Sequence, residues 1–110
     1  MEEYEIILTP DAIEDLKELR DYIANVLLSP KAALDYVLAV RKTIASLSQL
    51  PARFRLLDDE PWHSRGVRRI IAKNYYVYYS IDQAAKKVYV MNVIYSRRDQ
   101  LLALSERESD

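Results

Sequence analysis

The stretch GVRRIIAKNYYVYYSID, residues 66–82, contains two runs of β-branched and aromatic residues separated by the dipeptide Lys-Asn. Such runs are typical of strands, and a two-residue break predicts a β-hairpin, here without its usual glycine. A third run of this kind, 88–95, follows a charged loop. We therefore expect three strands, at 67–72, 75–81 and 88–95, with the middle one inside a sheet.

Two helices are expected before these strands, because a Thr-Pro pair and a Ser-Pro pair each precede an amphipathic segment. Thr9 and Ser29 suit the capping position, and proline suits the first helical position. Apolar residues then recur at three- and four-residue steps until Pro51 ends the second helix. With a short strand at 4–8, the order β-α-α-β-β-β predicts an α+β fold. In this fold a helical hairpin packs on a small, mainly antiparallel sheet of about four strands, followed by a short C-terminal helix at 98–106.

Length and composition fit a single domain that spans residues 1–110. Half of the residues are apolar, which is enough for a two-layer core. The absence of cysteine excludes disulfides and thiol chemistry. No apolar run reaches the roughly 18 to 20 residues of a membrane span, and the start of the chain lacks the pattern of an export signal. We therefore expect a cytoplasmic protein with no membrane association.

The net charge of −1 is unevenly distributed along the chain. Residues 1–25 carry −6, whereas residues 51–98 carry +6, from ten basic against four acidic side chains. The basic second half suits phosphates or an acidic protein partner, and the acidic first segment would repel nucleic acid. The charge pattern thus argues against a wholly basic nucleic-acid binder.

Three stretches carry further information: Thr-Pro-Asp-Ala at 9–12, the hairpin stretch at 66–82, and VYVMNVIYSRRDQLLAL at 88–104. In their order and residues they resemble the RelE/ParE superfamily of toxins from type II toxin-antitoxin pairs. The resemblance implies a toxin that is bound and silenced by a cognate antitoxin. The free toxin would either cleave messenger RNA on the ribosome or poison DNA gyrase.

RNA cleavage without a metal or cofactor requires removal of the ribose 2′-hydroxyl proton, neutralisation of phosphate charge and protonation of the leaving oxygen. Arginine binds phosphate oxygens well. In the nuclease branch, basic residues at positions that resemble Arg68 and Arg97 act on the phosphate, so we take Arg68, Tyr75 and Arg97 as candidate catalytic residues. Candidate substrate-binding residues are Arg65, Arg69, Lys73, Tyr95 and Arg98. Alternatively, the strand arginines cover the sheet and pair with acids.

Several positions depart from the nuclease pattern. Tyr75 stands where that branch carries a strand arginine, and Ala103 stands near the place of an expected tail tyrosine. His63, the only histidine, could act as a base, but a loop residue without chemistry is the favoured interpretation. Asp58 to Glu60 are interpreted as a solvated loop and not as a metal site. We predict the nuclease because it is the commoner chemistry of the family; gyrase poisoning without a catalytic site, and a nontoxic scaffold, are the alternatives.

The tyrosines of the hairpin stretch divide between two faces of the expected strand. Tyr75, Val77, Tyr79 and Ile81 point one way, and Tyr76, Tyr78 and Ser80 point the other way. We expect the helix-facing set to fill the core. The other set would form the floor of a concave face that also receives Arg68 and Arg97, where bases could stack at about 1–3 kcal/mol each.

An antitoxin segment that adds a helix or a strand would suit the apolar grooves of such a domain. Because residues 51–98 are basic, we expect this antitoxin segment to be acidic.

Overall fold

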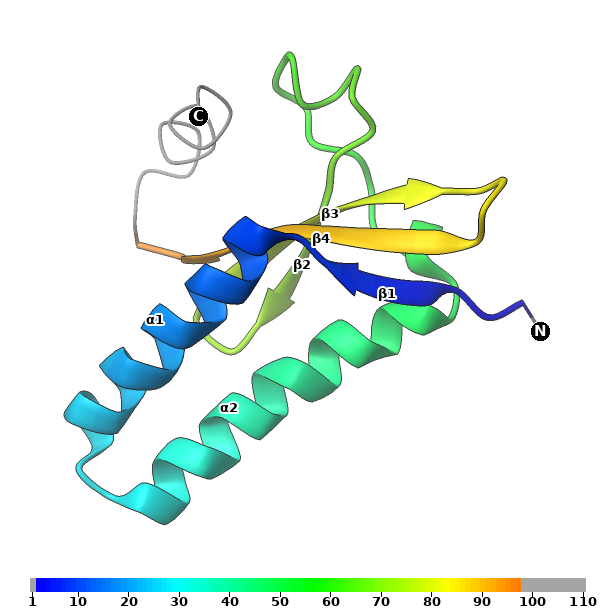
Figure 1. Cartoon of the computed structure of the whole chain (residues 1–110). Coiled ribbons are helices and arrows are strands. Elements are labelled where there is room, and N and C mark those ends of the chain that lie inside the picture. Colours follow the sequence, from blue (N-terminus) through cyan, green and yellow to red (C-terminus); the bar gives the residue numbers. More distant parts are fainter. Residues whose placement is uncertain (1, 98–110) are drawn as a thin grey trace.

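The computed structural model describes residues 2–97, and the helix expected at 98–106 lies outside them. The described residues form two layers, a helical hairpin and a four-stranded sheet, with the helices on one side of the sheet (Figure 1). No described helix is long and apolar enough to cross a bilayer. The elements in chain order are β1 (Glu5–Leu8), α1 (Pro10–Leu27), α2 (Pro30–Ala45), the 3₁₀ turns η1 (Ser46–Ser48) and η2 (Pro51–Arg53), β2 (Arg68–Ala72), β3 (Tyr75–Asp82) and β4 (Lys87–Tyr95).

Side-chain caps begin both helices, as predicted. The Thr9 hydroxyl accepts a hydrogen bond from the Ala12 backbone N–H at 3.2 Å, and Ser29 does the same for α2. The Thr9 oxygen also lies 3.0 Å from the carbonyl oxygen of Val90, so the cap ties the start of α1 to β4. At the tip of the hairpin, Leu28 adopts a left-handed conformation with φ of 54°.

The strand order in the sheet is β1-β4-β3-β2. β1 is parallel to β4, and the other neighbours are antiparallel. The prediction of a mainly antiparallel sheet with the tyrosine-rich strand in its interior is therefore confirmed. β1 and β2 are the two edge strands of the described sheet.

The alternation predicted for β3 is also confirmed. Tyr75, Val77 and Tyr79 are buried in the main core beneath the two helices. Tyr78 is buried on the opposite side, in a smaller core with Trp62. Most of the tyrosines of β3 are therefore core residues, as expected. Each of the two faces of the sheet receives tyrosine rings. We call the face turned away from the helices the open face.

A register shift between β3 and β4 helps to position α1. It falls between Tyr78 and Tyr79, where β4 contains an additional residue. Close to it, the backbone N–H of Val93 donates to the buried carboxylate of Asp15 at 2.9 Å. A buried carboxylate needs such donors, so this bond fixes where α1 sits on the sheet.

The segment between η2 and β2 crosses to the open face (Figure 1). Its Trp62 packs with Val67, Tyr78 and Ile94 in the smaller core on that face. Gly66, at φ 75°, has nothing within 4 Å of the place that a Cβ would occupy. Gly66 therefore serves the turn into β2 and not a close backbone approach.

Candidate functional site

Arg68 lies on the helix-facing side of β2, because it pairs with Tyr79 of the main core. Its Nη1 donates to the carbonyl oxygen of Phe54 at 2.5 Å. The buried Tyr79 hydroxyl donates to the Pro51 carbonyl at 2.6 Å. Together these two side chains hold the η2 segment against the sheet.

The expectation that Arg68 shares a face with Tyr76 and Tyr78 is wrong. Successive residues of a strand point to opposite faces, and Arg69, the next residue, occupies that place. Its guanidinium carbon lies 4.2 Å from the ring centroid of Tyr76.

Tyr75 is only 6% exposed, at the start of β3. The centroids of the Tyr36 and Tyr95 rings lie 6.5 and 5.5 Å from that of Tyr75. Burial, reinforced by the neighbouring tyrosines, raises the pKa of Tyr75 to about 12. Its hydroxyl is therefore neutral at physiological pH and poorly suited to take a proton.

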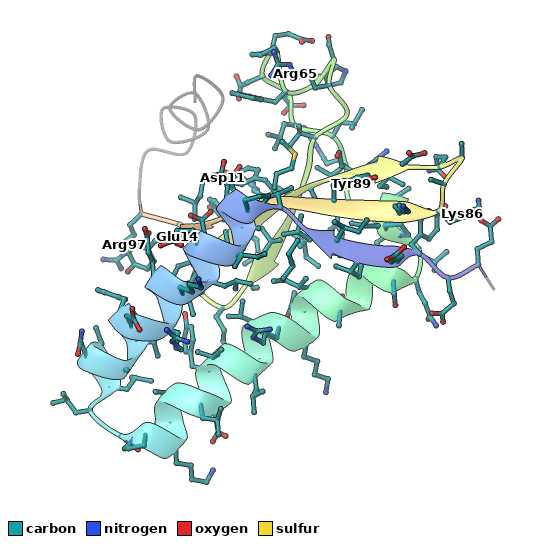
Figure 2. The ribbon with its side chains drawn as sticks, in the orientation of Figure 1. Asp11, Glu14, Arg65, Lys86, Tyr89 and Arg97 are labelled. Atoms are coloured by element: carbon teal, nitrogen blue, oxygen red, sulfur yellow. The ribbon has the colours of Figure 1, made fainter. Side chains whose placement is uncertain are left out.

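The remaining candidates lie at two places. Lys73 and Arg97 lie at the end of the sheet where Tyr75 pairs with Tyr95, and Arg65 lies on the segment above the open face. Arg97 is exposed, two residues beyond the end of β4, and Arg65 lies 5.6 Å from the Trp62 ring. Figure 2 shows Arg65 and Arg97 well apart. Lys73 occupies the β2–β3 turn, with Nζ 5.9 Å from the Tyr36 ring. Arg98 lies outside the described residues.

Of the catalytic candidates, Arg68 lies apart from Tyr75, whereas Arg97 follows the strand end that pairs with Tyr75. The strand register places Arg68 opposite Tyr79, four residues along β3 from Tyr75, which corresponds to about 13 Å. The guanidinium of Arg68 is also turned toward the η2 segment and away from the open face.

Local hydrogen bonds hold the segment that contains His63 and the three acids. Nδ1 of His63 lies 2.8 Å from the carbonyl oxygen of Leu57, so this nitrogen must be the donor. Asp58 pairs with Arg55 at 2.6 Å. Glu60 accepts from the Ser64 N–H at 3.2 Å, and its bonds with Ser64 lower the pKa of Glu60.

A hollow of about 330 Å³ near the open face adjoins the Arg69–Tyr76 stack. Its lining residues are Arg55, Leu56, Leu57, Asp58, Asp59 and Arg69.

A groove, which we call the β1 groove, follows the edge of β1 on the helix side. Two adjoining hollows of about 170 and 200 Å³ share Leu8, Leu16 and Arg41. Their apolar lining residues are Ile6, Leu8, Ile13, Leu16, Val37, Ile44 and Ala45, and their basic ones are Lys17, Arg20 and Arg41.

The three cations of the β1 groove were not among the residues chosen from the sequence. Lys17, Arg20 and Arg41 each directly follow an apolar helix residue, so they border the buried stripe and do not lie opposite it. This border position can be identified in the sequence. It indicates a groove only when the two helices are placed beside β1.

Comparison with known proteins agrees with this architecture. Residues 6–100 match the model of the ParE toxin of the type II toxin-antitoxin system parDE, whereas no curated protein sequence matches the chain. In the solved structures below, sequence identity is low, so their similarity concerns the fold.

One similar structure is the chromosomal ParDE system from P. aeruginosa, with 20% identity, TM-score 0.67, and coverage of 84% of this chain and 95% of that one. The RelBE2 toxin-antitoxin complex from Mycobacterium tuberculosis has 22% identity, TM-score 0.60, and coverage of 84% and 98%. The isolated RelE toxin from E. coli has 13% identity, TM-score 0.55, and coverage of 97% and 99%. Because the family model covers most of the sequence, the chain belongs to the ParE toxin family of type II toxin-antitoxin systems.

Proposed function

We propose that this toxin inhibits growth by binding DNA gyrase, without a catalytic site of its own, and that a cognate antitoxin neutralises it. The observation that carries the proposal is that Arg68 and Tyr75 do not form a site together. Arg68 donates to the carbonyl oxygens of Ala52, in η2, and of Phe54, which follows η2. Tyr75 is buried with a pKa raised to about 12. Metal-free RNA cleavage needs an acid, a base and a cation around one phosphate.

The nuclease predicted from the sequence stays a prediction, because the described residues provide no test of RNA cleavage. The two mechanisms leave different products in the cell. A nuclease produces new messenger RNA ends, and a gyrase poison produces DNA breaks with gyrase attached.

The antitoxin is proposed to bind the β1 groove. Within the described residues, β1 pairs only with β4, so its outer edge can accept a further strand. The floor of the groove is apolar, and its rim carries Lys17, Arg20 and Arg41. These features suit a segment that alternates apolar with acidic residues. The acidic antitoxin expected from the sequence would thus meet helix cations and not the strand arginines.

The test of the mechanism is brief induction of the isolated toxin in a bacterial host, followed by parallel mapping of messenger RNA ends and gyrase-linked DNA breaks. DNA breaks with intact messages are the expected result. New RNA ends in translated regions, without DNA breaks, would refute gyrase binding and support the nuclease mechanism predicted from the sequence. Induction that leaves growth, RNA and DNA unchanged would instead favour the nontoxic scaffold.

A further inference from the structure

The open face presents an exposed group of side chains that the core does not use. We call Arg69, Ile71 and Tyr76 the β2 patch. Ile71 is 61% exposed, although strand positions with apolar side chains are usually covered. Ile71 pairs with Tyr76 across β2 and β3, and Arg69 pairs with Tyr78. The three members of the patch are therefore neighbours on one surface.

Aromatic contacts fix the orientation of Arg69. Its guanidinium lies 4.2 Å from the centroid of the Tyr76 ring, and Tyr76 in turn packs against Tyr78, with centroids 6.4 Å apart. Burial raises the pKa of Tyr78, and a hydrogen bond from Arg69 partly offsets this effect. A guanidinium held in this way loses little freedom when it binds a ligand.

Arg69 has no carboxylate partner among the ion pairs of residues 2–97. The nearby Arg55, by contrast, already pairs with Asp58. Arg69 thus presents a positive charge next to a hollow of about 330 Å³. Carboxylates and phosphates are the groups that bind such a planar fork best.

The surroundings favour a carboxylate over a nucleic-acid strand. Asp58 and Asp59 line the same hollow and would repel a chain of phosphates more strongly than a single carboxylate on Arg69. Ile71 offers apolar contact that a phosphate backbone does not use. Arg and Tyr beside an exposed aliphatic residue are instead typical of the centre of a protein interface.

We infer that the β2 patch is the surface that contacts the target protein, by accepting a carboxylate on Arg69 and an apolar side chain over Ile71. This inference rests on the proposed function, because it takes gyrase as the target. It assigns the target and the antitoxin to different parts of the toxin, the β2 patch on the open face and the β1 groove on the helix side.

The test measures binding of the purified full-length toxin to purified DNA gyrase by biolayer interferometry. Arg69→Glu removes the carboxylate contact by charge reversal, and Ile71→Asp independently removes the apolar contact. Lys42→Glu is the matched control, because it makes the same charge change as Arg69→Glu at an exposed position of α2. Thermal unfolding of each variant checks that it is folded.

We expect at least a tenfold loss of affinity for Arg69→Glu and for Ile71→Asp, and less than a threefold change for Lys42→Glu. If the wild type binds gyrase and both patch variants bind equally well, the inference is refuted and the proposed function stands. A wild type that does not bind gyrase would refute the proposed function itself. Variants that keep gyrase binding but no longer cleave messenger RNA on ribosomes would assign the patch to RNA and likewise overturn the inference.

Discussion

Replacement of Tyr75 by phenylalanine distinguishes a core tyrosine from a catalytic one. The substitution removes only the hydroxyl and leaves the ring between Tyr36 and Tyr95. If Tyr75 is a packing residue, the Tyr75→Phe toxin should fold, bind its antitoxin and inhibit growth like the wild type. If Tyr75 is a general base, the same variant should be folded but harmless.

The expected magnitudes follow from its surroundings. With a pKa of about 12, the hydroxyl is ionised in about one molecule in 10⁵ at pH 7, so its loss removes almost no available base. Because the buried ring remains, the free energy of unfolding should change by no more than about 1 kcal/mol. Tyr75→Ala, which deletes the ring, should instead destabilise by about 3–5 kcal/mol, by analogy with other large aromatic deletions.

The assay pairs urea unfolding, followed by circular dichroism, with colony counts after induction of each variant. Growth inhibition by Tyr75→Phe at wild-type strength is the expected outcome. A Tyr75→Phe protein with normal stability that has lost its toxicity would refute the packing explanation and support the nuclease. Tyr75→Ala is the control for loss of folding, because it should lower both the urea midpoint and the growth inhibition.

Three further predictions concern stability and partner binding. Tyr79→Phe should destabilise the protein by about 1–2 kcal/mol, because it leaves the Pro51 carbonyl without its buried donor. The midpoint of urea unfolding measures this loss. Tyr76 is only partly buried on the open face, so Tyr76→Phe should shift the midpoint much less. Burial raises the pKa of both Tyr75 and Tyr79 to about 12. Since the unfolded chain releases these protons near pH 10, stability should be unchanged below that pH and fall between about pH 10 and 12, by about 1.4 kcal/mol per pH unit for each tyrosine. If the free energy of unfolding, measured by urea titrations, does not change between about pH 10 and 12, this prediction is wrong. Lys17→Glu combined with Arg41→Glu should reduce co-purification of a co-expressed antitoxin at least tenfold without loss of toxicity; undiminished recovery of the antitoxin would exclude the β1 groove.

Local chemistry made most of the fold predictable. Thr9 and Ser29 each stand before a proline and cap a helix in the structure. The period-two pattern of β3 separated helix-facing from open-face tyrosines correctly. These features depend on neighbours a few residues apart, and such neighbours are visible in one sequence.

The position of the site residues depended on longer-range contacts. Arg68 is tied to Phe54, fourteen residues earlier, and no local pattern indicates that contact. The groove beside β1 arises because β1 pairs with β4, from the other end of the described chain. Pairing of this kind is set by the whole topology, so the sequence alone did not suggest the role of Lys17 or Arg41.

The parallel pairing of β1 with β4 also has a consequence for synthesis. Glu5 pairs with Lys87 and Leu8 with Val90, so β1, the first of the described strands to be made, must wait for β4, the last of them. At about 5–20 residues per second, a chain of 110 residues takes about 5–20 s to make. A ribosome that stalls before β4 therefore releases a chain whose first strand has no partner and whose core is incomplete. Products that end before β4 should thus be unable to complete the sheet, and the described domain can form only once translation has passed Tyr95.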